Sequence, residues 1–153
     1  MKTILAPVDF SPVTERVVET ALALARSLRG RVVLLHVVPP PVVTSEYGVL
    51  LEDLATLTKT AETAAAKLLA RLRRRRSARA VPIDTIQRSG GPVAHILKEA
   101  AELKAAYVVI GSHGHNAFYD LLVGSTTHSI LLKAPCPVVV IHAAWKKAGR
   151  KRK

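Results

Sequence analysis

Glycines and hydroxyl side chains stand in this sequence at a spacing that could bind phosphate. The stretch GSHGHNAFYDLLVGST, residues 111–126, holds three of the chain's 8 glycines and follows the apolar run YVVI. Gly124 directly precedes Ser125, Thr126 and Thr127, which open a predicted helix. The first turn of a helix exposes unpaired N–H groups and the positive end of its dipole, and both attract phosphate. The pattern favours a phosphate site, although glycines that serve only as turn and cap residues would fit it too.

The better-known phosphate and metal signatures are missing. The sequence contains neither GxxxxGK[ST] nor a GxGxxG after its first apolar run. His113 and His115 stand two residues apart, but nothing else in the sequence completes a ligand set, so we predict no metal held by the protein alone. No Ser-His-Asp set is visible, and no lysine lies in the glycine stretch. We therefore name no catalytic residue.

Alternating strands and helices must position the glycine stretch. Apolar runs predict five strands, at residues 3–8, 31–38, 80–88, 106–110 and 137–142. Helical patterns lie between them, at residues 12–28, 51–76, 92–104 and 125–133. Ser11 suits the N-cap of the first helix and Gly30 its end, while Pro82 places the third strand at a sheet edge. This order predicts a single doubly wound α/β domain with a parallel sheet and helices on both faces.

Two polar loops follow strands of this sheet. Asp9 and Ser11 come after the first strand, and the glycine stretch comes after the fourth. In doubly wound sheets, ligands bind beyond the carboxyl ends of the strands, where the strand order reverses. If the first and fourth strands are neighbours, both loops face one crevice.

Composition and charge limit the other possibilities. The chain has 153 residues, 49% of them hydrophobic, which suits one domain with a proper core. The net charge of +12 equals the number of basic residues in two groups, the Arg71–Arg79 cluster and the tail. These groups are Arg71, Arg73, Arg74, Arg75, Arg76 and Arg79, and Lys146, Lys147, Arg150, Lys151, Arg152 and Lys153. The single cysteine, Cys136, is predicted to be a buried structural thiol.

The spacing Gly111-x2-Gly114-x9-Gly124-Ser125 resembles the ATP-binding branch of the universal stress protein family. The opening ILAPVDFSPVTE, the run VVLLHVV, the segment SGGPVAHIL and the ending GSTTHSILLKAPCPVVVI are also similar to that family's pattern. The resemblance covers residues 2–142. It implies a five-stranded parallel sheet in the order 3-2-1-4-5, adenine-nucleotide alpha-hydrolase-like, in a domain over residues 1–143. Residues 144–153 are expected to be a basic, disordered tail.

The resemblance also implies roles for particular residues. Asp9 would bind the ribose hydroxyls, Val38 would present its backbone to adenine, and Pro7 would add apolar contact. Gly111, His113 and Gly114 would line the ribose and α-phosphate. The terminal phosphates, with Mg²⁺ where it accompanies ATP, would lie against Gly124, Ser125, Thr126 and Thr127. Asp9 and Ser125 as plain helix caps, and Val38 as a core residue, stay open as alternatives.

The function implied is a nucleotide-dependent stress-response switch or sensor that binds ATP, with AMP or ADP as other candidate ligands. Slow ATP hydrolysis is an alternative. A second alternative is a nucleic-acid-binding protein that uses the Arg71–Arg79 cluster and the tail, although 4% aromatic residues give little base stacking. A third is an enzyme related to the adenylating or electron-transfer flavoprotein families.

The resemblance and the sequence also predict a partner and a cellular location for the protein. In the family the fifth strand pairs across a two-fold axis, so we expect a homodimer through Val138, Val139, Val140 and Ile141. The start MKTILAPVDF is no signal peptide, and no run reaches the length of a membrane span, so we expect a cytoplasmic protein without membrane contact.

Overall fold

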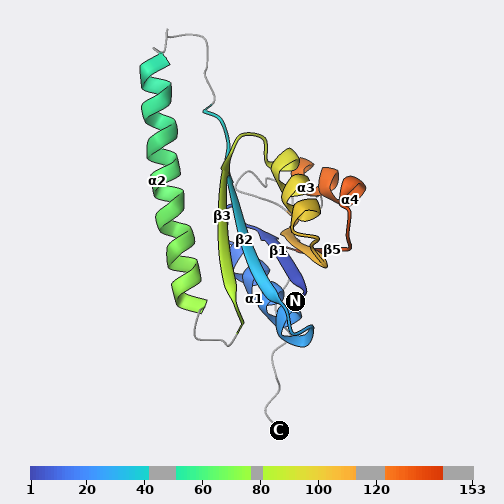
Figure 1. Ribbon diagram of the computed structural model, residues 1–153. Coiled ribbons are helices and arrows are strands. Elements are labelled where there is room, and N and C mark those ends of the chain that lie inside the picture. Colours follow the sequence, from blue (N-terminus) through green and yellow to red (C-terminus); the bar gives the residue numbers. More distant parts are fainter. Residues whose placement is uncertain (42–50, 77–80, 113–122, 143–153) are drawn as a thin grey trace.

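The computed structural model describes residues 1–41, 51–76, 81–112 and 123–142, without the side chains of residues 51–53, 75 and 76. Five strands and four helices alternate along the chain (Figure 1). In order they are β1 (Thr3–Pro7), α1 (Thr14–Ser27), β2 (Arg31–Val38), α2 (Leu51–Arg76), β3 (Ile83–Ser89), α3 (Pro92–Glu102), β4 (Tyr107–Gly111), α4 (Ser125–Lys133) and β5 (Val138–Ile141).

The sheet has the order β3-β2-β1-β4-β5, and each neighbouring pair is parallel. This confirms the predicted doubly wound sheet, including the reversal of strand order between β1 and β4. Leu5 of β1 pairs with Val33 of β2 on one side and with Val108 of β4 on the other. β3 lies at one edge, as Pro82 indicated, and β5 lies at the other.

Both faces of the sheet are covered, because side chains of a strand point alternately to its two faces. Ile4 and Ala6 of β1 pack with Val17 and Ala21 of α1, and Leu69 of α2 joins the same core cluster. Leu5 points the other way and packs in a cluster that includes Ile96 of α3 and Ile130 of α4. Figure 1 shows α2 alongside β3, with α3 and α4 on the other side of the sheet.

The C-terminal end of α1 departs from the prediction. Gly30 was predicted to end α1, but the left-handed residue is Arg29, at φ 50. Gly30 N–H then reaches the carbonyl of Ala25 at 2.7 Å, as in a Schellman motif. A glycine is required at position 30 because a side chain has no space there: a Cβ would lie 2.3 Å from the carbonyl oxygen of Lys2.

Cys136 is only partly buried, so the thiol is more exposed than predicted. It lies in the turn before β5, a short edge strand that has a neighbour on one side only. Burial still raises the pKa of the Cys136 thiol, and a hydrogen bond with the Val108 backbone partly offsets this effect. In the described part of the chain, no helix combines the length and apolar character needed to cross a membrane.

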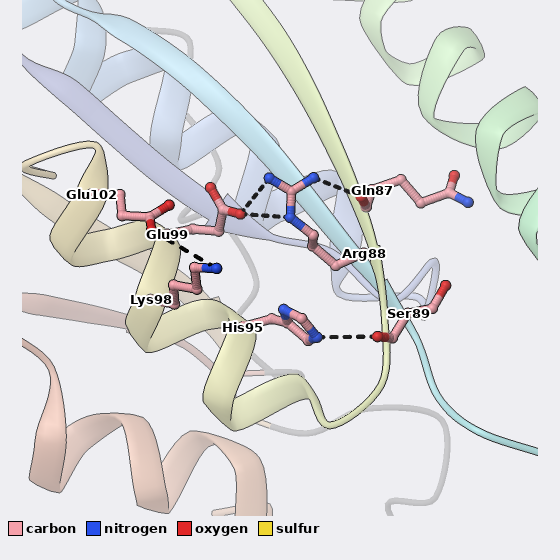
Figure 2. Close-up of polar contacts among 7 residues, drawn as sticks. All are labelled: Gln87, Arg88, Ser89, His95, Lys98, Glu99 and Glu102. Atoms are coloured by element: carbon pink, nitrogen blue, oxygen red, sulfur yellow. Dashed lines mark hydrogen bonds and ion pairs between the residues drawn. The ribbon is translucent and has the colours of Figure 1, made fainter.

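An ion pair ties β3 to α3 (Figure 2). The Arg88 Nε and Nη2 atoms each lie 2.7 Å from Glu99 Oε1. The two partners differ in exposure, because the Glu99 side chain is 3% exposed and that of Arg88 is 44% exposed. Removing the arginine would leave a buried carboxylate without its countercharge, whereas removing the carboxylate would leave a cation that water still reaches.

Arg88→Met is therefore expected to lower the free energy of unfolding by about 3 kcal/mol, and Glu99→Gln by only about 1 kcal/mol. Urea denaturation of both variants measures the difference. Lys98→Gln is the control, because its pair with Glu102 is exposed and long at 3.9 Å, and the change should be near zero. Equal losses for the two variants of the Arg88–Glu99 pair would contradict this account.

Candidate functional site

A cavity of about 450 Å³ lies at the carboxyl ends of β1, β2 and β4. The sheet order reverses between β1 and β4, so the cavity occupies the place where doubly wound sheets bind ligands. The described residues that line it are Pro7, Val8, Asp9, Val13, Thr14, Val17, Leu35, His36, Val37, Pro39, Pro92, Ile96, Ile110, Gly111, Gly124, Ser125, Thr126 and Thr127. Asp9 after β1, and Gly111 and Gly124 at the two described ends of the glycine stretch after β4, thus face one crevice, as predicted.

Most of the predicted site residues come together here. The lining includes Pro7, Asp9, Gly111, Gly124, Ser125, Thr126 and Thr127. His113 and Gly114 lie outside the described residues. Val38 is buried and is not among the lining residues, and its carbonyl oxygen accepts the Gly90 N–H at 2.9 Å. Its neighbour Val37 lines the cavity instead.

Sequence reasoning missed a second group of lining residues. No ligand role was predicted for His36, Pro39, Pro92 or Ile96. All four line the cavity, together with Val37. Their places in the sequence were the available signal: His36 and Val37 lie near the carboxyl end of a predicted strand, Pro39 directly follows that strand, and Pro92 opens the helix after a glycine turn.

The start of α4 forms one end of the cavity. Gly124 is the N-cap, in extended conformation, and makes no side-chain cap bond. Two hydrogen bonds join this helix start to the end of β4: Gly124 N–H donates to the Ser112 carbonyl at 2.8 Å, and the Thr127 hydroxyl donates to the Gly111 carbonyl at 2.7 Å. The first N–H groups of a helix have no acceptor within it, so this end of the cavity offers donors and positive potential.

Asp9 organises the turn between β1 and α1. Its Oδ1 accepts the Ser11 N–H at 3.0 Å and lies 3.4 Å from the Thr14 hydroxyl. The prediction that Ser11 is the helix N-cap was wrong, because α1 begins at Thr14 after Val13 and has no side-chain cap bond. The carboxylate accepts the backbone donor two residues on, as Asp does in tight turns, and the chain makes a further turn before the helix starts.

His36 supports the same turn from β2. Its Nδ1 lies 2.7 Å from the Val8 carbonyl oxygen, so Nδ1 carries the proton and donates it. The ring also lies 4.4 Å, centre to centre, from the ring of Phe10, whose φ of 62 falls in the left-handed region. A bulky residue rarely adopts that conformation without support, so the His36 contacts stabilise the turn that carries Asp9.

The cavity is lined by both polar and apolar residues. Asp9 is the one carboxylate among the described lining residues, and neither lysine nor arginine occurs among them. Val37, Pro39 and Ile96 are apolar, while Ser125 and Thr126 add hydroxyls beside the start of α4. No cluster of metal-ligating side chains exists among the described residues. The arrangement suits a ligand with an apolar ring at one end and an anionic group at the other.

A parallel sheet in this order, with a crevice at its reversal, defines a doubly wound α/β protein, a class in which ligands bind at the strand ends. The model of the Universal stress protein family matches residues 1–142, and the chain belongs to this family.

Known relatives are similar to this protein over nearly the whole length of the chain. Universal stress protein A homolog 1 of Coxiella burnetii is 32% identical over 149 residues, which are 95% of this chain and 97% of that protein. The solved structure of universal stress protein UspA from Lactobacillus plantarum has a TM-score of 0.77 and 31% identity, over 92% of this chain and 97% of its own. The solved structure of hypothetical protein MJ0577 has a TM-score of 0.78 and 26% identity, over 92% and 94% of the two chains.

His36→Phe is expected to lower the free energy of unfolding by about 1–3 kcal/mol, since the Val8 carbonyl loses its donor in a partly buried site. Thermal and urea unfolding measure the loss. His95→Phe is the matched control, because its bond to the Ser89 carbonyl, 3.1 Å long, is exposed (Figure 2). His36→Asn restores a donor near Nδ1 and should recover part of the loss. Losses of equal size at His36 and His95 would contradict the role of His36.

Proposed function

We propose that this protein binds ATP in the crevice at the ends of β1, β2 and β4 and acts as a nucleotide-dependent switch in a stress response. The observation that carries the proposal is that Asp9, Gly111 and the start of α4 line one cavity. They come from separate parts of the chain and meet at the reversal of the sheet.

Each part of a nucleotide has a matching surface. The uncapped start of α4, with the hydroxyls of Ser125 and Thr126, offers donors to phosphate oxygens. The Asp9 carboxylate, at the end of β1, can accept hydrogen bonds from ribose hydroxyls. Val37, Pro39 and Ile96 offer apolar contact to a flat base, as most ligand pockets do. The backbone contact of Val38 with adenine stays a prediction.

Nucleotides occur in solved structures with the same fold. One is titled universal stress protein in complex with cAMP, and another is an Arabidopsis thaliana family protein with AMP bound. They are 19% and 18% identical to this chain, with TM-scores of 0.69 and 0.65, so their likeness establishes the fold alone. Their titles support an adenine nucleotide as the ligand class.

A switch fits the lining better than a fast hydrolase. Among the described lining residues, only Asp9 and His36 are side chains that could act as a general base, and both hold the turn after β1. A Mg²⁺ ion that arrives with ATP would be held by phosphate oxygens and by the hydroxyls of Ser125 and Thr126, and would neutralise phosphate charge.

Gly124→Val should abolish saturable ATP binding, or weaken it at least about tenfold, because a branched side chain would stand where phosphate approaches the backbone. Calorimetric titration of nucleotide-free protein, with and without Mg²⁺, measures this. Gly91→Val is the matched control: Gly91 is also an extended N-cap glycine, at the start of α3, and does not line the cavity. An absence of ATP binding by the native protein would overturn the proposal.

We also propose a homodimer through β5. This strand is a sheet edge, and Val138, Val139 and Val140 are only half-buried in the single chain. Exposed apolar edge strands need a cover, and a second copy supplies one. Sedimentation at micromolar concentration should give a dimer, and Val139→Lys should give a monomer. A monomeric native protein under these conditions would contradict the proposal.

A further inference from the structure

We propose that the crevice selects its nucleotide by charge: it binds adenine nucleotides whose phosphate charge is low or is neutralised by Mg²⁺, and it excludes metal-free ATP. This inference rests on the proposed function and deepens it, because it concerns the form in which the ligand enters. The observation that carries it is the distribution of charged side chains. In a chain with 23 basic residues, none of the described residues that line the crevice is lysine or arginine.

The parts of the sequence that form the crevice contain no basic residue over long stretches. Every described lining residue except Val17 lies in one of four segments, residues 3–15, 32–58, 89–97 and 105–132. Together these segments hold six of the chain's 11 acidic residues and none of its 23 basic ones. The stretches 42–50 and 113–122 belong to these segments, so they contain no lysine or arginine either, although they lie outside the described residues.

Basic residues that border these segments are directed elsewhere. Arg16, next to Val17, donates to the His142 carbonyl at 3.5 Å, at the end of β5. Arg88 pairs with the Glu99 carboxylate at 2.7 Å (Figure 2). The arginine-rich end of α2 leads into β3, so it lies at the amino ends of the strands, opposite the crevice (Figure 1). The large positive charge of the chain is therefore not a property of the crevice.

The charges that do face the crevice cannot balance a polyphosphate. The start of α4 offers roughly half a positive charge from the helix dipole, while Asp9 adds a carboxylate. Metal-free ATP brings about four negative charges at neutral pH, whereas AMP and the magnesium chelate of ATP each bring about two. Charge that leaves water without a countercharge costs free energy, and a nearby carboxylate adds repulsion. Each further phosphate without a metal ion therefore weakens binding.

The donors at the start of α4 are neutral, which suits a phosphate whose charge is balanced by its own metal ion. Gly124 makes no side-chain cap bond, and Ser125 and Thr126 add hydroxyls. Backbone N–H groups and hydroxyls orient phosphate oxygens by hydrogen bonds, but they supply no full countercharge. Mg²⁺ in a chelate with ATP supplies that charge, and hydroxyl and phosphate oxygens are the ligands it prefers.

The alternative is that cations from outside the described residues reach the phosphates. The tail is the candidate source, because it follows β5, and the carboxyl ends of parallel strands lie at one end of the sheet. With six basic residues at hand, a site of that kind would bind more tightly with each added phosphate. The two accounts predict opposite trends along the series AMP, ADP and ATP.

Calorimetric titration of the nucleotide-free full chain with AMP, ADP and ATP, each with EDTA at fixed ionic strength, tests the inference. We expect the affinity to fall from AMP to ATP, and metal-free ATP to bind at least about tenfold more weakly than ATP with excess Mg²⁺. Thr126→Lys places a cation at the start of α4 and should reduce this metal dependence to less than about threefold. Leu132→Lys is the matched control: it adds the same charge to α4 at a residue that is 72% exposed and does not line the crevice, and it should leave the metal dependence unchanged.

Three outcomes would overturn the inference. The first is metal-free ATP that binds as tightly as ATP with Mg²⁺. The second is an affinity that rises from AMP to ATP without metal, which would indicate cations from the tail. The third is an equal reduction of the metal dependence by Thr126→Lys and Leu132→Lys, which would show attraction to the whole protein rather than selection in the crevice. A failure of ATP to bind even with Mg²⁺ would instead overturn the proposed function itself.

Discussion

The strand β1 has a parallel neighbour on each side, and the rest of the molecule is arranged around this pairing. Its residues Ile4 and Leu5 are fully buried and point to opposite faces of the sheet. Both faces must therefore be covered, which the crossover helices do. The chain leaves β1 toward β2 in one direction and later returns to β4 in the other. A gap at the carboxyl end of the sheet follows from that reversal, because the helices diverge to opposite faces there.

Hydrogen bonds between loops and strand ends keep this gap in shape. The Thr127 hydroxyl and the Gly124 N–H join the start of α4 to the end of β4, while His36 joins the end of β2 to the turn after β1. Each bond satisfies a backbone group where regular pairing ends, as buried polar groups require. The start of α4 and the Asp9 carboxylate are consequently held by rigid strands. This is the arrangement that a site needs to bind one ligand geometry without a large ordering cost.

The prediction from sequence was most accurate where a repeating pattern was long. The bounds of β2, α2 and α4 and the edge position of β3 agree with it, because periodicity of apolar residues extends over many positions. It failed where one residue decides the geometry. Ser11 is a common N-cap residue, yet the Asp9 carboxylate accepts from its N–H. His36 and Val37 line the cavity although no ligand role was predicted for them, because both lie near the carboxyl end of β2. Cys136 lies in a turn before an edge strand that buries it only in part.

By itself, the sequence determined the fold class and predicted that Asp9, Gly124 and Ser125 lie at a crevice at the strand ends, since these features depend on local spacing and residue type. Only the tertiary structure decided that His36, Pro39 and Pro92 share the cavity. It alone revealed a hollow of about 330 Å³ between α2 and β3, with Ala66, Ala70, Thr85 and Gln87 among its lining residues. The physical reason is that a cavity depends on which side chains fail to fill the space between two elements. That depends on distances between residues far apart in the chain, which no local pattern encodes.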